Sequence, residues 1–326
     1  MDGTSGTMLE VVEADALAYQ VDALVLKHAD VPRGVDRATG KLLGLDLEGE
    51  LPAGNHVIVP GRPAVGAEDV LFISVGPLLT FGYREIGTFA EEALEILARE
   101  RADVKTVALT LHGAGYGLDE LACLDSEVRG LIDAIEDGKA PGSLEQVLIL
   151  ESDPGRAERL RLRLRETLPA SNHGSSAFRI EAEDPAAGEV LQQSVAAAPE
   201  QQDHAFIAMP FAAEFDDVFH YGIAAAVRNS GLLCERIDRG IFTGDILDRV
   251  KDKISTATLL VADLTDANPN VYLEVGYAWA KGVPAVLIKK SDSELMFDVR
   301  GERCLDYRSI KELEDSLTAE LRQLVE

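Results

Sequence analysis

The second half of the chain alternates strictly between strand-like and helix-like patterns, and this alternation constrains its fold more than any other feature. Short apolar runs indicate strands at 205–208, 232–236, 258–262 and 285–288. Helical periodicity indicates helices at 214–229, 245–256, 269–280 and 309–324. Such alternation favours a parallel sheet covered by helices on both faces. Ligands of such sheets bind beyond the carboxyl ends of the strands. We therefore expect one edge to carry residues 209–211, 237–243 and 263–270.

The first half is also α/β, and a polar stretch follows it. Strand patterns occur at 9–12, 23–26, 56–59, 70–75, 104–111 and 146–150, and helical patterns at 83–99, 118–135 and 155–167. Residues 171–202 are rich in Ser, Ala, Pro, Gln and acidic residues, which is typical of a linker. Within that stretch, residues 178–181 could add a short strand. We predict two domains, 1–170 and 203–326, joined by this linker.

The charge balance limits the possible partners. The 326 residues include 57 acidic residues against 31 Lys plus Arg, which gives a net charge of −26. Such a field repels nucleic acid and anionic membranes, and no basic patch offsets it, so we expect neither as a partner. The chain lacks an apolar run of about 18 residues and a signal-peptide pattern. The three cysteines lie far apart, which is typical of reduced thiols. We therefore expect a cytoplasmic protein.

One carboxylate, Glu274, stands in an otherwise apolar helix pattern. A charge on an apolar face costs free energy unless it is paired or neutralised. Asn268 is a candidate cap and Pro269 suits the first helical position, so the helix would point its amide end at the sheet edge. Asn270 and Tyr277 share the face of Glu274. A carboxylate there could attack an electron-poor sugar carbon, or stabilise the cation formed as a base departs, as in N-glycoside cleavage.

A structural alternative is open for the same residues. Glu274 could be paired with a Lys or Arg from elsewhere in the fold, and Asp263 could simply cap the turn that follows its strand. The six histidines show no ligand spacing, so no metal site is predicted.

The order of motifs in this half resembles the nucleoside 2-deoxyribosyltransferase and TIR-like family. The motifs are MPF at 209–211, ADLT at 262–265, NPNVYLEVGYAWAKG at 268–282 and LIKK at 287–290. The resemblance implies a flavodoxin-like fold and cleavage of N-glycosidic bonds in nucleosides, nucleotides or NAD. It also implies that the family nucleophile is Glu274, that the strand-end acid is Asp263, and that the substrate loop is Met209, Pro210 and Phe211.

One position departs from the deoxyribosyltransferase pattern. Those enzymes have an Asp six residues before the Glu, where this chain has Asn268. The difference favours the TIR-like branch, which hydrolyses or binds NAD and related nucleotides. Our hypothesis is that Asp263 and Asn270 hold the ribose, the phosphates rest at the helix start, and Glu274 stabilises or captures the anomeric carbon. We expect a hydrolase with NAD or a nucleotide as substrate and no cofactor. The alternatives are a non-catalytic nucleotide-binding module and a deoxyribosyltransferase-type nucleosidase.

A glycine-rich loop follows a strand in the first half. Gly113, Gly115 and Gly117 alternate with other residues, which could let backbone amides converge on a phosphate. With AYQVDALVLKHAD at 18–30 and LTLHGAGYGLDE at 109–120, this half resembles macro domains, most closely the macro-like N-terminal domain of leucine aminopeptidases. The resemblance implies a three-layer α/β domain that binds ADP-ribose-type ligands around this loop. The Asn-rich turn of macro domains is replaced at 27–30, which favours ligand sensing or a structural role over de-ADP-ribosylation.

The two resemblances together suggest one hypothesis. Cleavage of NAD yields ADP-ribose, and the neighbouring domain resembles an ADP-ribose reader, so one domain could regulate the other. By family analogy alone, we expect a homo-oligomer with a role in bacterial anti-phage defence.

Overall fold

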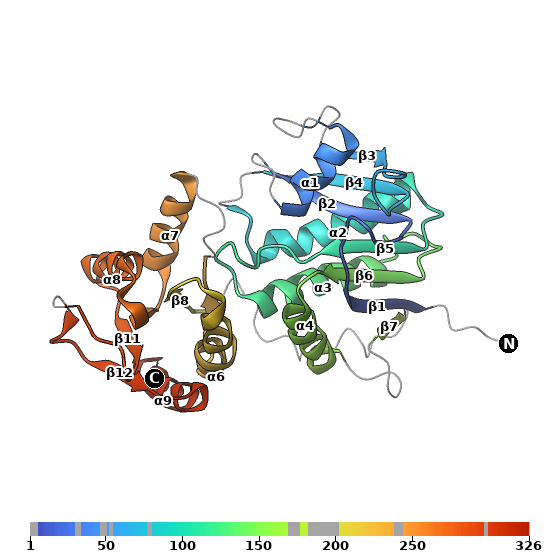
Figure 1. Ribbon diagram of the computed structural model, residues 1–326. Coiled ribbons are helices and arrows are strands. Elements are labelled where there is room, and N and C mark those ends of the chain that lie inside the picture. The colour runs from blue at the N-terminus through green and yellow to red at the C-terminus, as the bar shows by residue number, and fades with distance from the viewer. Residues whose placement is uncertain are drawn as a thin grey trace. The chain divides into compact units, whose positions relative to one another are not determined.

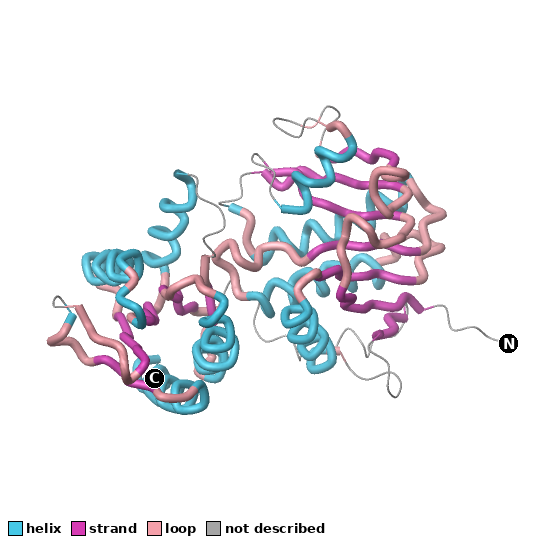
Figure 2. Tube along the Cα trace, viewed as in Figure 1, coloured by secondary structure: helices cyan, strands magenta, loops and turns pink. Residues whose placement is uncertain are grey.

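The computed structural model describes residues 6–29, 34–45, 51, 55–76, 80–168, 177–181, 202–237, 244–296 and 299–325. Its contacts divide the chain into two compact units. The N-terminal unit comprises Met1–Gly113 and Leu121–Glu200, and the C-terminal unit comprises Ala114–Glu120 and Gln201–Glu326. Figure 2 shows that the described strands of each unit gather in one sheet, with helices packed beside it. A short segment from the first half of the sequence, Ala114–Glu120, thus belongs to the C-terminal unit.

The N-terminal unit is built on a mixed sheet of seven strands among its described residues (Figure 1). The strands are β1 (Gly6–Glu13), β2 (Ala23–Ala29), β3 (His56–Pro60), β4 (Asp69–Gly76), β5 (Thr106–Thr110), β6 (Gln146–Glu151) and β7 (Ala177–Glu181). They lie in the order β3-β4-β2-β5-β6-β1-β7. The inner neighbours run parallel, and the edge strands β3 and β7 pair antiparallel. Strand β2 is almost wholly buried, as expected for a parallel strand covered on both faces.

The helices of this unit are α1 (Gly34–Leu43), α2 (Tyr83–Glu100), α3 (Glu120–Glu136) and α4 (Pro154–Thr167). Helix α2 buries residues at helical spacing, among them Ile86, Ala90, Ala93 and Leu97. Helix α4 begins at Pro154 because the Asp153 carboxylate accepts the Arg156 amide at 2.6 Å and so caps it. The sequence patterns predicted α2, α3, α4 and the six strands β1 to β6, but they did not predict α1. Strand β7 lies in the stretch predicted as a linker, where a short strand was considered.

The C-terminal unit is built on a sheet in which every described pair of strands runs parallel. The strands are β8 (His204–Ala208), β9 (Leu233–Glu235), β10 (Leu259–Asp263), β11 (Ala285–Lys290) and β12 (Cys304–Tyr307). They lie in the order β12-β11-β10-β8-β9. Read from the β9 edge and numbered along the chain within this unit, the strands therefore lie in the order second, first, third, fourth, fifth. The sequence patterns predicted all of them except β12.

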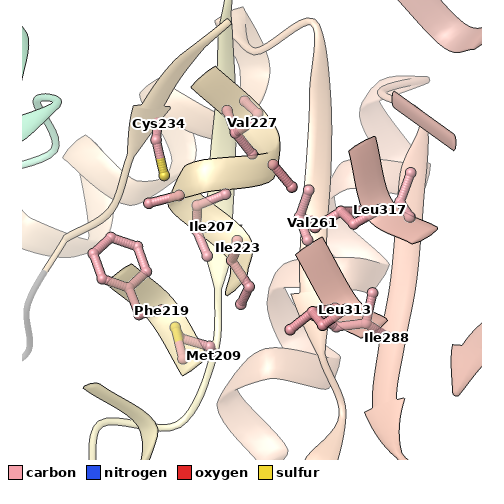
Figure 3. Packing of buried hydrophobic residues seen from close by; sticks show 14 of the residues in the cluster. Ile207, Met209, Phe219, Ile223, Val227, Cys234, Val261, Ile288, Leu313 and Leu317 are labelled. Carbon is pink, nitrogen blue, oxygen red and sulfur yellow. The ribbon is translucent and has the colours of Figure 1, made fainter. Parts of the chain in front are cut away.

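Helices cover both faces of this sheet. They are the 3-10 turn η3 (Ala213–Phe215), the π-helix η4 (Val218–Ile223), α6 (Ala224–Asn229), α7 (Gly244–Thr256), the 3-10 turn η5 (Thr265–Ala267), α8 (Pro269–Lys281) and α9 (Ile310–Val325). Side chains of η4, α6 and α9 form one core with the strand residues Ile207 and Val261 (Figure 3). Side chains of α7 and α8 form the other core with Phe206 and Leu260. Successive strand residues alternate between the two cores, as the pleat of a strand requires.

The helix predicted at 214–229 is divided into η3, η4 and α6. Gly222, in the π-helical turn, lies against the Leu313 side chain of α9, which would stand 2.8 Å from a Cβ placed on that glycine. A contact from a distant helix therefore accompanies the irregular turn. The predicted mixed α/β class with parallel strands in both halves is confirmed. Among the described helices, none is both long enough and apolar enough to cross a membrane.

Candidate functional site

Two of the predicted site segments meet at the carboxyl edge of the C-terminal sheet. Ala208 of β8 pairs with Ala262 of β10, so Met209 and Asp263 are the next residues of two neighbouring parallel strands. The chain leaves β8 toward the core that contains η4, and it leaves β10 toward the core that contains α8. A crevice opens at such a topological switch point, and ligands of open α/β sheets bind there. We call residues 209–211 and 263–274 the switch-point edge.

Asp263 is a buried carboxylate at the end of β10. It is 0 % exposed. One oxygen accepts the Thr265 amide at 2.9 Å and the Thr265 hydroxyl at 2.5 Å, and the other accepts the Tyr307 hydroxyl at 3.0 Å. Burial raises the pKa of Asp263, although these hydrogen bonds and the charge of Lys290 act in the opposite direction. Asp263 therefore fixes the turn after β10 and ties it to β12, while its assignment as a catalytic residue stays a prediction.

The turn that follows Asp263 has an unusual backbone. Asp266 has φ 63° and Ala267 has φ 48°, the left-handed region that favours glycine. Each such residue costs about 1–3 kcal/mol unless the surroundings hold it, and such residues cluster at functional sites. The turn is held by the Asp263 hydrogen bonds and by the Lys290 amide, which donates to the Thr265 hydroxyl at 3.1 Å. It delivers the chain to the start of α8.

Helix α8 begins as predicted, with Asn268 as its cap and Pro269 in its first turn. The Asn268 side chain accepts the Asn270 amide at 3.0 Å. The Asn268 carbonyl accepts the amides of Val271 and Tyr272 at 3.1 and 3.4 Å. Pro269 has no amide hydrogen to offer. The amides of the first turn are thus satisfied within the chain, so a ligand here meets the helix dipole rather than open N–H groups.

Glu274 lies on the boundary between the two sides of α8. Val271, Val275 and Ala278 are buried against the sheet, whereas Leu273 is 66 % exposed. Glu274 itself is half-buried. Helix α8 starts at the switch-point edge and points its amide end there. The Glu274 carboxylate lies in the first half of this helix.

The other two residues predicted on this helix differ from Glu274 in their contacts. Asn270 is exposed, and its side-chain amide donates to the Asn268 side chain at 3.3 Å. The Tyr277 hydroxyl lies 3.3 Å from the Ser255 hydroxyl of α7, and its ring lies 5.5 Å from the Lys281 ammonium. Asn268 and Asn270 therefore lie at the switch-point edge, while Tyr277 contacts the neighbouring helix.

The predicted substrate loop is partly buried in the hydrophobic core. Met209 and Pro210 are buried, whereas Phe211 is 39 % exposed. The Met209 sulfur lies 3.6 Å from a guanidinium nitrogen of Arg236, which follows β9. The same guanidinium lies 5.6 Å from the centre of the Phe211 ring. Of residues 237–243, also expected at this edge, only Ile237 is among the described residues.

Two cations at the carboxyl edge were missed by the sequence reasoning. Arg236 lies 3.7 Å over the Phe219 ring, in addition to its contact with Phe211. Lys290, the last residue of β11, places its ammonium 5.3 Å from the centre of the Phe215 ring. The strand ends were predicted, so the rule that parallel sheets bind ligands at carboxyl ends could have singled out both residues.

The glycine-rich loop takes the conformation that only glycine adopts easily. Gly113, Gly115 and Gly117 have φ values of 86°, 81° and 88°. From Ala114 onward the loop belongs to the C-terminal unit. The Gly117 amide donates to the Arg236 carbonyl at 3.1 Å, so this amide is already bonded within the protein. The role of these glycines as a phosphate loop stays a prediction.

The Ala114–Glu120 segment is bound along β9. Tyr116 forms an antiparallel bridge with Ile237, and the Arg249 guanidinium donates to the Tyr116 carbonyl at 2.5 Å. The Asp119 carboxylate accepts both the Arg228 guanidinium and the Cys234 amide at 3.0 Å. An edge strand exposes unpaired backbone groups, and this segment covers part of that edge. Local sequence patterns carry no signal for such a placement.

No family model and no curated protein matches the chain. Solved structures similar to its N-terminal half are macrodomains. An Oceanobacillus iheyensis macrodomain variant with ADPR is 16% identical and covers 50% of this chain and 95% of its own, with a TM-score of 0.40. The Trypanosoma brucei macrodomain in complex with ADP is 13% identical and covers 48% and 67%, with a TM-score of 0.39. The macrodomain of Mycobacterium tuberculosis DarG is 21% identical and covers 44% and 98%, with a TM-score of 0.33.

Proposed function

We propose that the C-terminal unit cleaves the N-glycosidic bond of NAD or a related nucleotide, with Glu274 as the catalytic carboxylate. The observation that carries the proposal is the meeting of residues 209–211 and 263–274 at the switch point of a parallel sheet. The strand order of this sheet supports it, since second-first-third-fourth-fifth is the order of flavodoxin-like sheets, which bind their ligand at this point.

The chemistry needs one carboxylate at the sugar. The bond between the anomeric carbon and the base nitrogen breaks, its electron pair leaves with the base, and the sugar carbon becomes electron-poor. Glu274 either stabilises that cation or bonds to it, and water then supplies the oxygen of the hydrolysed product. In this proposal Asn268 and Asn270, at the start of the same helix, bind ribose hydroxyls in exchange for the hydrogen bond between their own side chains. Asp263 contributes by holding the strained turn in place.

The test is turnover of NAD and of a mixture of nucleotides, followed by mass spectrometry. Glu274→Gln keeps the shape of the side chain and removes its charge, so we expect a fall of about 10²–10³-fold in rate, as for loss of a preorganised electrostatic group. Glu302→Gln, at an exposed acid between β11 and β12, is the matched control and leaves the rate unchanged. Equal rates for wild type and Glu274→Gln would remove Glu274 from the chemistry. Free base released from deoxynucleoside monophosphates would instead indicate the nucleosidase alternative.

One observation favours a second candidate, a nucleotide-binding module without turnover. Both oxygens of Asp263 already accept hydrogen bonds from Thr265 and Tyr307, so Asp263 does not offer its carboxylate to a substrate. Calorimetric binding of ADP-ribose or a cyclic nucleotide, with no product formed on long incubation, would support this candidate.

For the N-terminal unit, we propose binding of ADP-ribose-type nucleotides that regulates the C-terminal unit. The support is the residue pattern of 18–30 and 109–120. Titration of the whole protein with ADP-ribose, with NAD turnover measured alongside, tests both parts. A role in anti-phage defence and assembly into a homo-oligomer belong to the same proposal, and sedimentation of the purified chain tests the assembly.

A further inference from the structure

Arg236 connects the edge strand β9 to the predicted substrate loop, residues 209–211. It comes two residues after Cys234, so it continues on the face of the sheet that packs into the core of Cys234 and Met209. One guanidinium nitrogen lies 3.6 Å from the Met209 sulfur, and the guanidinium carbon lies 5.6 Å from the centre of the Phe211 ring. The side chain therefore contacts the first and the last residue of the loop.

The ring of Phe219 supports the same guanidinium from the core. Phe219 is buried beside Met209 (Figure 3), and its ring centre lies 3.7 Å from the Arg236 guanidinium carbon. The flat guanidinium packs well on aromatic rings. Arg236 thus contacts one ring that is fixed in the core and one, that of Phe211, that reaches solvent. These contacts depend on where the guanidinium lies, whatever other groups it also binds.

The backbone at Arg236 is bonded to a segment from the first half of the sequence. The Gly117 amide donates to the Arg236 carbonyl at 3.1 Å, and Tyr116 forms an antiparallel bridge with Ile237. Both bonding residues belong to Ala114–Glu120, which is part of the C-terminal unit. Strand β9 needs this support, because it has three residues and pairs through its ladder with β8. A ladder that short fixes the end of a strand weakly.

Asp119 fixes the same strand at the residue two positions before Arg236. Its carboxylate accepts the Cys234 amide at 3.0 Å and the Arg228 guanidinium at 3.0 Å. The segment Ala114–Glu120 is therefore bonded on both sides of the Arg236 side chain. A shift of this segment would move the residue that contacts the substrate loop.

We propose that Ala114–Glu120 positions the predicted substrate loop through Arg236, which makes Arg236 a positioning residue for the N-glycosidic cleavage. This inference rests on the proposed function and names the residues that set how the substrate lies against the loop. Phe211 is the loop residue that reaches solvent, so a planar base packs against its ring. That contact exists before and during bond cleavage, so its loss weakens binding and leaves the chemical step unchanged.

The first test is the kinetics of NAD cleavage by Arg236→Met in the full chain. We expect KM for NAD to rise about ten-fold and kcat to change less than about two-fold. Arg236→Lys, which keeps the charge but not the planar group, should raise KM as well. Arg303→Met is the matched control and changes neither value, since that side chain is 72 % exposed and pairs with Glu320 of α9. A merely structural role for Arg236 would lower the amount of folded enzyme, so kcat would fall at constant KM.

The second test asks whether the segment acts through Arg236. Asp119→Ala should raise KM about five-fold in the wild-type background and should have no further effect in Arg236→Met, because residues on one route are not additive. Asp119→Asn is the milder second variant and should raise KM in the same direction by less. Effects of Asp119→Ala and Arg236→Met that multiply would overturn the proposed route.

Each outcome separates this inference from the proposed function. If NAD is cleaved and KM is unchanged in Arg236→Met, or is restored in Arg236→Lys, the inference falls and the proposed function stands. If NAD is not cleaved, hydrogen exchange of the peptide at 209–219 decides, because it needs no substrate. Faster exchange in Asp119→Ala, with no further rise when Arg236→Met is added, supports the route against the proposed function. Equal exchange in wild type and both variants overturns the route.

Discussion

The most exacting test of the C-terminal unit concerns Asp119, which lies far from that unit in the sequence. Its carboxylate is 2 % exposed and accepts the Arg228 guanidinium and the Cys234 amide, both at 3.0 Å. Burial is the largest single influence on the pKa of Arg228 and lowers it, but the charge and hydrogen bond of Asp119, together with the charges of Cys234 and Glu120, raise the pKa overall. The two charges therefore hold the Ala114–Glu120 segment to β9 and α6. Asp119→Ala should loosen this part of the unit.

The size of the effect follows from the geometry. At 3.0 Å and an effective dielectric constant of about 20, the two charges attract by about 5 kcal/mol, from which the cost of removing both from water is subtracted. Removing one partner of a buried pair costs about 3–5 kcal/mol. Since the Arg228 side chain is 26 % exposed, we expect the lower end, about 3 kcal/mol, including the Cys234 amide that loses its acceptor. Asp119→Asn keeps an acceptor and should lose less.

Hydrogen exchange measured by mass spectrometry on peptides of α6 and β9 reports the local free energy of opening. We expect these peptides to lose about 3 kcal/mol of protection in Asp119→Ala, while those of β2 and β5 do not change. Asp103→Ala, at an exposed acid, is the control. A double variant, Asp119→Leu with Arg228→Leu, should recover much of the loss because no charge is left unpaired. Unchanged protection of α6 and β9 in Asp119→Ala would refute the reasoning.

Three further perturbations test the site. The pKa of Asp263 is raised in the folded state, so its contribution to stability is present at low pH and is lost as the pH rises through that pKa. Asp263→Asn should abolish this loss of stability. Urea unfolding followed by Trp279 fluorescence between pH 3 and 7 measures it. Ala267→Gly removes the strain of a non-glycine residue in the left-handed region, so the free energy of unfolding in the same assay should rise by about 1 kcal/mol. If the turn positions the site, kcat should fall in the same variant. Gly117→Ala should cost about 1 kcal/mol or more, since φ is 88° and the new Cβ would lie 3.0 Å from Ile237; no loss in Tm would contradict the described loop.

Much of the fold was predictable because its strands and most helices carry complete local patterns. Helix α1 was missed for a physical reason. Its buried residues are Asp36, Thr39 and Gly40, and Asp36 forms an ion pair with Lys27 of β2 at 2.8 Å. A helix that buries polar side chains has no apolar period to detect. Strand β12 was missed because a four-residue strand such as CLDY is too short to show alternation.

The candidate site was predictable only in part. Residues 209–211 and 263–274 follow strands whose patterns are clear, so their shared edge followed from the rule for parallel sheets. Lys290 was noted only as the end of the LIKK motif and Arg236 only as the end of a predicted strand, and the order of strands places them on either side of the switch point. The position of Asp119 in the C-terminal unit depends on contacts with α6 and β9, which no local pattern encodes.

Three features that lower the stability of the fold lie in the few residues that precede α8. Asp263 is a carboxylate removed from water, and Asp266 and Ala267 take left-handed conformations; each of these lowers stability. Any one could be an accident of folding, but all three fall between the end of β10 and the Asn268 cap. A sequence without further constraint would replace Ala267 by glycine at no cost to the core. The concentration of strain at the switch point therefore favours a turn kept for its geometry, and if Ala267→Gly raised stability without altering turnover, that argument would fail.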